Sequence, residues 1–322
     1  MTRRFINELS DGDSIDDVFL IADKQIRANR NASLYLLVEM RDKTGVLSAR
    51  MWNVTEQSVS NVSAGDFARA RGKVQSYQGT LQVILTGIAP VAAEGLDLAD
   101  FVPSPRQEAS KYRERVVEIL SSIKDEPMRI LMNCFLEDPE IMDRFCQAPA
   151  GTKTHHAYQG GLLEHVATML EIGLLIGPLY PEMNNEVLLV GIFLHDLGKI
   201  RELSFDCGFG YTSEGQLLGH MMLGVEMLTE KIRQVEQRMG ISFPVETQLR
   251  LKHLILSHHG SYEFGSSKLP MTPEAIALHH IDNLDAKVHE FTRDIQNDPN
   301  PGSDWTPFSA RLDRKLYKGF RG

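Results

Sequence analysis

Short apolar runs occupy the first 90 residues of the chain, and glycine-containing turns separate several of them. The runs lie at residues 17–21, 33–39, 46–52, 66–74 and 81–85. Apolar and polar positions alternate in residues 46–52, which is the period of a β-strand with one buried face. Five short strands within about 75 residues are typical of a small Greek-key barrel. The pattern therefore predicts a β-barrel domain over residues 1–92.

From residue 110 onward the apolar positions recur every three or four residues, which is the period of an α-helix packed on one side. At residues 272–274 the sequence Thr-Pro-Glu is a strong helix start, with a capping threonine, proline at the first position and an acid in the first turn. Helices are expected at about 161–176, 186–199, 215–239, 246–259 and 273–292.

Two further segments lack either period. Residues 93–109 contain Pro103 and Pro105 and are expected to form a linker. Residues 297–322 begin with a run of asparagine, proline and glycine and are expected to be a basic tail. The predicted organisation is a multidomain α and β chain in which the barrel precedes the linker, an all-α domain over 110–296 and the tail.

One strand of the expected barrel is basic. Arg69, Arg71 and Lys73 alternate along it, so their side chains would share one face. Small barrels of this kind include the OB fold, which binds oligonucleotides. With Tyr77 and Tyr35 as stacking partners, this face would form a groove for single-stranded nucleic acid. A solvated basic strand beside ordinary barrel aromatics fits the same residues.

The net charge of −9 opposes nucleic-acid binding over the whole surface. Its distribution is uneven. Residues 1–90 carry 11 Lys and Arg against 10 Asp and Glu, which is +1, and the remaining 23 against 33 give −10. Any contact with a nucleic acid is therefore expected to be local.

Cysteine usage and hydropathy favour a cytoplasmic protein with no membrane contact. The three cysteines form no C-x-x-C pair, which argues against a disulfide framework and a cysteine zinc site. No apolar run is expected to reach the roughly 18–20 residues that cross a membrane. The N-terminus lacks the apolar core of a signal peptide. A length of 322 residues favours two domains, and a homo-oligomer is compatible with these features.

The candidate chemistry lies in the helical part of the chain. The stretch Gly191–Ile200 is apolar up to adjacent His195 and Asp196. Imidazole and carboxylate together suit divalent Mn, Fe, Co, Ni or Zn. Gly198 would take the left-handed conformation that ends a helix, so both side chains would lie at a helix end.

An isolated His-Asp pair is more often a buried histidine hydrogen-bonded to its neighbour than a metal site. Here, however, all 11 histidines fall between His155 and His289, in separate predicted helices. Core histidines would be scattered through the whole chain. Their clustering favours a metal site assembled from several helices.

Several segments of the sequence resemble known families. His165, His195-Asp196 and Asp282 are similar to the H…HD…D signature of the HD superfamily of metal-dependent phosphohydrolases. The runs HHAYQGGLLEH at 155–165, ILSHHG at 255–260, TPEA at 272–275 and DNLDAKV at 282–288 resemble the YhaM-type 3′→5′ exoribonucleases. Those proteins carry an OB-fold ahead of the HD domain, so the resemblance covers about residues 10–295.

Phosphodiester hydrolysis explains why such residues would be gathered. Two cations about 3.5–4 Å apart generate the nucleophile and stabilise the charge that develops around phosphorus. Asp196 is the candidate bridge between them, because each of its two oxygens can reach one metal. The resemblance implies that the first metal is held by His165, His195, Asp196 and Asp282, and the second by Asp196, His220 and His258.

Other residues would assist the reaction. Lys199 would contact a phosphate oxygen, and His156 would protonate the leaving oxygen. The periodicity separates His258 from His259 only weakly, so His259 would replace or assist it as a ligand. Mn²⁺ is the favoured ion, with Fe, Co, Ni or Mg as alternatives. The residues expected to support the ligands are His259, His279 and Asp285.

Three functions are open at this point. The resemblance implies an enzyme that hydrolyses single-stranded RNA, or DNA, from the 3′ end while the barrel feeds the strand. A second hypothesis is a phosphohydrolase acting on cyclic dinucleotides or nucleoside phosphates. A Gly-Tyr-Pro motif after the paired histidines would favour cyclic dinucleotides, and residues 258–265 lack it. The third hypothesis, a non-catalytic nucleic-acid binder, is disfavoured by the complete ligand set.

Overall fold

The computed structural model describes residues 3–29, 33–77, 80–97, 100–101, 109–151, 158–205, 210–296, 298, 302–309 and 311–319. The chain divides into two compact units, each of which is described by itself. One contains residues 1–104, 206–209 and 291–322, and the other contains residues 105–205 and 210–290.

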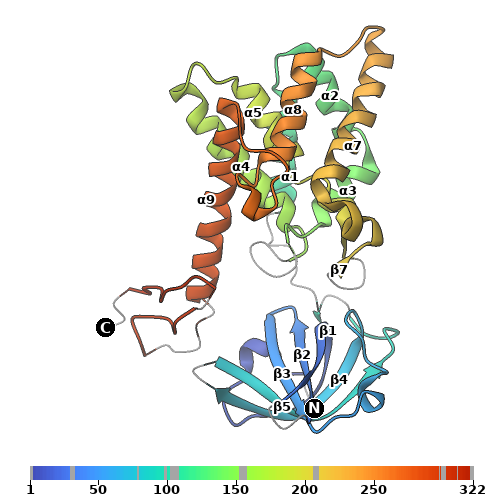
Figure 1. Cartoon of the computed structure of the whole chain (residues 1–322), viewed down its shortest axis with the longest axis vertical. Coiled ribbons are helices and arrows are strands. Elements are labelled where there is room, and N and C mark those ends of the chain that lie inside the picture. Colours follow the sequence, from blue (N-terminus) through green and yellow to red (C-terminus); the bar gives the residue numbers. More distant parts are fainter. Residues whose placement is uncertain are drawn as a thin grey trace. The chain divides into compact units, whose positions relative to one another are not determined.

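The first unit contains a closed five-stranded barrel (Figure 1). The strands follow the order β1-β2-β3-β5-β4 around the barrel, and the β3–β5 pair is parallel. The predicted small barrel is confirmed, although several strands are longer than the apolar runs suggested. The strands are β1 (Ser14–Ala28), β2 (Leu34–Asp42), β3 (Gly45–Trp52), β4 (Phe67–Tyr77) and β5 (Thr80–Val91).

Side-chain alternation fills the barrel interior. In β2, Leu36, Val38 and Met40 are buried, whereas Leu37 and Glu39 between them are only partly buried. This is the period of two expected of a strand whose inner face lies against the core. Two short 3₁₀ helices, η1 (Ile6–Glu8) and η2 (Gln57–Val59), also belong to this unit.

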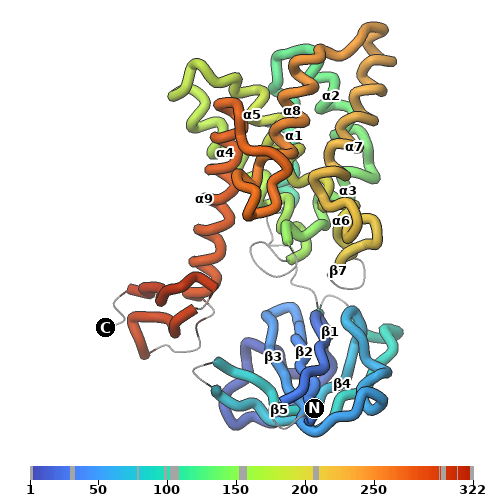
Figure 2. Tube along the Cα trace, viewed as in Figure 1, coloured from blue at the N-terminus to red at the C-terminus, as the bar shows by residue number. Residues whose placement is uncertain are grey.

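Among the described residues of the second unit, regular structure is helical apart from the short pair β6 (Leu203–Ser204) and β7 (Gly210–Tyr211). The predicted helical domain is confirmed, and the tube in Figure 2 follows its path. The helices are α1 (Ala109–Ser121), α2 (Glu126–Leu136), α3 (Pro139–Gln147), α4 (Gly161–Ile176), η4 (Gly177–Leu179), α5 (Asn185–Leu194), α6 (Lys199–Glu202), α7 (Ser213–Met239), α8 (Val245–Ser257), η5 (Tyr262–Phe264) and α9 (Pro273–Gln296).

Helix α5 is buried on all sides. Its residues from Val187 to Leu194 are all buried, which is why the segment is apolar all round rather than on one stripe. The ring of Phe193 meets Phe135 and Phe145 edge to face, at centroid distances of 5.7 and 5.4 Å. Helices α4 and α8 pack against it. The C-terminal end of α5 is therefore held rigidly inside the domain.

Two expectations about this helix end were wrong. The helix ends at Leu194 rather than near residue 199, and residues 195–198 form a turn before α6. Gly198 has φ −59° and is not left-handed. A Cβ atom at Gly198 would collide with the backbone oxygen of His220. Glycine is required there because the backbone of α7 approaches this closely.

By mean hydropathy one segment is long and apolar enough to cross a membrane, although charged residues interrupt it. Residues Gly161–Leu179, which form α4 and η4, meet that test by length and composition. Leu162, Val166 and Leu170 of this segment are nevertheless buried inside the protein, as are Glu164 and His165. A buried acid and a buried histidine are typical of a core helix.

The predicted tail has local structure of its own. Backbone bridges join Trp305 to Tyr317 and Ser309 to Arg314. Between them the buried Leu316 accepts a hydrogen bond from the backbone of Thr306, at 2.9 Å. Part of the C-terminal segment is therefore folded.

Candidate metal centre

The turn after α5 carries His195 and Asp196 into the interior of the helical unit. The backbone N–H of His195 still donates to Gly191 of α5, at 2.9 Å, and that of Lys199 donates to Asp196, at 2.9 Å. The turn is thereby fixed at both ends. His195 is fully buried and Asp196 is 2% exposed.

One group of candidate ligands comes from three elements. His165 of α4, His195 of the turn and Asp282 of α9 each place a ligand atom within 4.8 Å of the others. His165 Nε2 lies 3.4 Å from Asp282 Oδ1, and His195 Nε2 lies 3.4 Å from Asp196 Oδ2. The structure thus brings together residues from three segments that are far apart in the chain.

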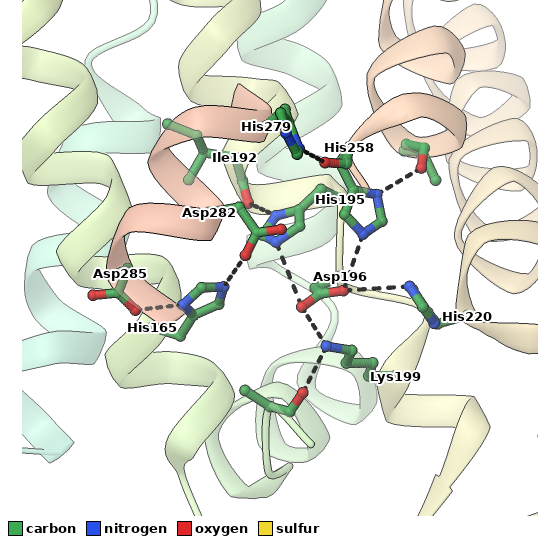
Figure 3. A network of polar contacts seen from close by, with 12 residues as sticks. His165, Ile192, His195, Asp196, Lys199, His220, His258, His279, Asp282 and Asp285 are labelled. Carbon is green, nitrogen blue, oxygen red and sulfur yellow. Dashed lines mark hydrogen bonds and ion pairs between the residues drawn. The ribbon is translucent and has the colours of Figure 1, made fainter. Parts of the chain in front are cut away.

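A second group lies on the other side of Asp196. His220 of α7, His258 at the end of α8 and the adjacent His259 place their ligand atoms within 4.8 Å of one another. The Nε2 atoms of His220 and His258 lie 3.5 and 3.7 Å from Asp196 Oδ1. Figure 3 shows Asp196 between the histidines of both groups. One carboxylate oxygen therefore faces each group.

Four of these five histidines are oriented through the other ring nitrogen, whereas Nδ1 of His259 is buried without a hydrogen-bond partner in the described part of the chain. Nδ1 of His195 lies 2.7 Å from the carbonyl oxygen of Ile192, and Nδ1 of His258 lies 2.8 Å from that of Ile255. A carbonyl can only accept, so Nδ1 carries the proton and Nε2 offers its lone pair. This is the tautomer that a metal-binding histidine requires.

The remaining two of these four histidines meet carboxylates at Nδ1. His165 Nδ1 lies 2.6 Å from Asp285 Oδ2, and His220 Nδ1 lies 3.2 Å from Glu202 Oε1. Asp285 is therefore placed to support a ligand, as the sequence predicted. Glu202 was missed, because its contact depends on how α6 and α7 meet and no spacing in the sequence indicates it.

The unsatisfied polar atoms test whether the site fits divalent cations. Among the described residues, Nε2 of His195, Nε2 of His220 and Oδ1 of Asp196 are buried and have no hydrogen-bond partner. Buried polar atoms without a partner are rare, because they have lost water and gained nothing. These atoms point at common centres, and a nitrogen-rich set with carboxylates suits transition metals. The two groups could therefore hold metal ions.

The electrostatics of the site keep its carboxylates charged. Burial raises the pKa of Asp196, but the charge of Lys199 and contact with His195 outweigh it and hold that pKa well below its usual value. Burial lowers the pKa of His258 well below its usual value. Asp196 is thus anionic beside a neutral His258, which is the state that a cation at the second group needs.

Lys199 is more enclosed than the sequence suggested. Its Nζ donates to Asp196 Oδ2 and to the carbonyl oxygen of Ala150, both at 2.6 Å. This makes Lys199 the counter-charge of the central carboxylate. Its predicted contact with a substrate phosphate stays a prediction. His156, the predicted acid, lies outside the described residues.

Two more predicted residues lie at the site. His259 belongs to the second group rather than behind it. His279 places Nδ1 2.8 Å from the carbonyl oxygen of His258, so it contacts the backbone of a candidate ligand. The choice between His258 and His259 as ligand stays open, since both lie near His220.

A cavity of about 360 Å³ opens onto the site. Its lining includes Asp196, Lys199, His258 and Asp282 together with the exposed Phe264. A second cavity of about 420 Å³ in the helical unit is lined by charged residues such as Asp138 and Lys231 and by none of the candidate ligands. The smaller cavity is therefore the candidate active-site cavity, because candidate metal ligands line it.

The barrel carries the predicted basic residues on its outer face. Arg69, Arg71 and Lys73 are exposed. The Nε atoms of Arg69 and Arg71 lie 2.6 and 3.1 Å from Asp16 Oδ1, so one acid partly neutralises both charges. Tyr77 is 51% exposed on the same strand.

Tyr35 belongs to a different part of the outer face. It is the register partner of Trp52, and the two rings lie 5.0 Å apart. Trp52 is 44% exposed and was missed, because its strand was treated only as barrel framework. The predicted nucleic-acid residues therefore give two candidate surfaces on different strands, one on β4 and one where Tyr35 of β2 meets Trp52 of β3.

Comparison with known proteins agrees with this architecture. Residues 162–287 match the HD domain family, and residues 21–91 match the OB-fold nucleic acid binding domain family. The 3'-5' exoribonuclease YhaM of Shouchella clausii is 35% identical over 95% of this chain and 94% of that protein. The proteins of the same name from Bacillus subtilis and Geobacillus sp. are 32% and 33% identical, over 95% of this chain and 95% and 92% of their own lengths. The chain belongs to the YhaM family of 3'-5' exoribonucleases.

Proposed function

We propose that the protein is a metal-dependent exoribonuclease that removes nucleotides from the 3′ end of single-stranded RNA. The observation that carries the proposal is the position of Asp196, whose Oδ2 lies 3.4 Å from His195 Nε2 and whose Oδ1 lies 3.5 Å from His220 Nε2. A carboxylate shared in this way suits two cations rather than one.

The candidate ligands form two sets, one for each cation. His165, His195 and Asp282 would hold one, and His220 with His258 or His259 would hold the other, while Asp196 would contact both. Divalent ions at such sites supply an activated water and neutralise the negative charge of the phosphodiester. The chain itself limits bulk water here, because Asp196 and His258, which line the cavity, are almost fully buried.

Mn²⁺ is the ion that we propose first. The two groups together offer five imidazoles and two carboxylates. Imidazoles suit transition metals such as Fe and Ni and carboxylates suit Mn²⁺, whereas Mg²⁺ prefers oxygen ligands throughout and keeps several waters. Activity in Mn²⁺ that exceeds activity in Mg²⁺ would follow from this ligand set.

The barrel is proposed to hold the RNA strand. Two surfaces support this, the basic face of Arg69, Arg71 and Lys73 and the ring pair of Tyr35 and Trp52. Stacking and backbone charge together are how proteins hold single strands without reading their sequence. DNA is a second candidate substrate, and we place the activity in the cytoplasm.

The test uses 5′-labelled single-stranded RNA and DNA incubated with the full-length protein, once with Mn²⁺ and once with chelator. A ladder of progressively shorter labelled products is expected with RNA and Mn²⁺, and no change with chelator. Immediate release of a labelled mononucleotide would mean that the protein degrades the strand from its 5′ end instead. If the protein hydrolysed cyclic dinucleotides or nucleoside phosphates but left the RNA intact, the second hypothesis would replace this proposal.

A further inference from the structure

Phe264 lies at an unusual place for a phenylalanine. It is 72% exposed, yet it lines the catalytic cavity together with Asp196 and His258. Apart from Ala286, the other side chains that line this cavity are charged, amide or imidazole groups. A large apolar ring left in water beside a polar cavity contributes nothing to the core.

The segment that carries Phe264 is held firmly against the metal centre. The backbone N–H of Phe264 donates to Ser261, at 3.2 Å, and that of Ser266 donates to Ser261, at 3.1 Å. The backbone N–H groups of Ser267 and Lys268 both donate to Leu256 of α8, at 3.2 Å. Because η5 follows His258 and His259 by only a few residues, the backbone that carries the ring is kept close to the candidate ligands.

The size of the cavity limits what can lie beside the ring. About 360 Å³ is near the lower end of the roughly 300–1,000 Å³ found for small-molecule sites, so it accommodates a single nucleotide. Every nucleobase has an apolar face that stacks on an aromatic ring, so this contact does not depend on the RNA sequence. An enzyme that shortens RNA of any sequence needs contacts of this kind.

We propose that Phe264 stacks on the base of the 3′-terminal nucleotide and so positions the last phosphodiester at the metal centre. The inference rests on the proposed function and adds the residue that recognises the end of the strand. Lys287, which lines the same cavity and is 56% exposed as a side chain, lies on the neighbouring helix α9 where a backbone phosphate would pass.

The experiment combines a change in the protein with a change in the RNA. Phe264→Ala is compared with Tyr262→Ala, a matched control on the same short helix that is 63% exposed and does not line the cavity. The substrates are one RNA oligomer with all its bases and three versions that lack the base at the terminal, penultimate or third position. Affinity is measured with chelator, and kcat/KM with Mn²⁺.

Phe264→Ala is expected to weaken binding of the complete RNA and to lower kcat/KM about tenfold, whereas Tyr262→Ala should change neither. Removing the terminal base should weaken the wild type by a similar factor and should leave Phe264→Ala no weaker than before. Phe264→Trp should restore binding, because it keeps a ring, and Phe264→Leu should not.

Equal losses of Phe264→Ala on complete and terminally abasic RNA would overturn the proposal, as would coupling to the penultimate or third base. Restoration by Phe264→Leu would mean that apolar bulk is sufficient and would also overturn it. Mn²⁺ affinity measured by calorimetry is expected to be the same in Phe264→Ala and the wild type. Failure of the wild type to shorten the complete RNA would instead refute the proposed function.

Discussion

Glu202 and His220 are joined twice: Glu202 Oε1 lies 3.2 Å from His220 Nδ1 and accepts a hydrogen bond from the backbone N–H of His220 at 3.0 Å. The second contact is available because Gly219, at φ 72°, interrupts α7 and frees that N–H. Contact with His220 outweighs burial and lowers the pKa of Glu202, so the carboxylate stays charged. The pair fixes both the ring and the backbone of a candidate ligand.

Replacing this carboxylate should therefore weaken the second metal site. Glu202→Ala is expected to lower the affinity of one of two Mn²⁺ ions by about 10- to 100-fold, as for other groups that orient ligands. Calorimetry of metal-free protein with Mn²⁺ gives the stoichiometry and both affinities. Glu226→Gln, at an exposed position on α7, the helix that carries His220, is the control. Two unchanged affinities in Glu202→Ala would contradict the role.

Removing the charge of the central carboxylate should abolish hydrolysis. Asp196→Asn keeps the size of the side chain but offers only one oxygen, so it cannot contact both groups. We expect activity on RNA to fall by several orders of magnitude, even in saturating Mn²⁺. Thermal unfolding followed by circular dichroism controls for folding, and Asp143→Asn, an exposed residue of α3, controls for charge. Activity near that of the wild type would refute the two-metal arrangement.

Metal binding should depend on pH in a definite direction. Burial lowers the pKa of His165, but hydrogen bonds with Asp282 and Asp285 outweigh it and raise that pKa to about 9. A cation at His165 Nε2 must displace the proton there. Affinity for Mn²⁺ should therefore rise with pH below about 9, by up to tenfold per unit, and level off above it.

Calorimetry in buffers with different ionisation enthalpies measures that proton release directly. About one proton per ion bound to the first group is expected near neutral pH, in addition to any from other ligands. Asp285→Asn should move the levelling-off to lower pH, because one of the two acids that raise the pKa is gone. An affinity that does not change between about pH 6.5 and 8.5 would contradict the assignment.

The two candidate surfaces of the barrel can be separated by substitution. Because Asp16 already pairs with Arg69 and Arg71, we expect the ring pair of Tyr35 and Trp52 to contribute more to RNA binding. Trp52→Ala should lower kcat/KM for RNA about tenfold and leave a small activated phosphodiester unaffected. Arg69→Gln with Arg71→Gln should mainly flatten the salt dependence of binding.

Fluorescence provides a second measurement of the same point. The chain contains two tryptophans, so Trp305→Phe leaves Trp52 as the only one. Its emission should be quenched when RNA is added in the presence of chelator. Emission that does not change, together with a large loss in the arginine double variant, would show that the strand lies on the basic face instead.

Local patterns in the sequence predicted the elements, but not how their ends meet. Short apolar runs, one of them with a period of two, located the five strands, and histidines in separate helical segments indicated a site assembled from several of them. Gly198 was expected to end a helix, because glycine most often does so after an apolar run, whereas its actual constraint comes from α7, more than 20 residues away. Glu202 was missed for the same reason, since its contact with His220 depends on a neighbour that no spacing reveals.

The close approach at Gly198 also bears on how such an enzyme can change over evolutionary time. With no side chain between them, the turn carrying Asp196 touches the backbone of His220 directly. The distance between Asp196 and the second group of candidate ligands is thus set by main-chain contact, which side-chain substitutions elsewhere do not alter. Exposed residues that line the cavity, such as Phe264 and Lys287, can therefore vary and change which nucleic acids the enzyme binds. The spacing between Asp196 and the second group is inherited unchanged.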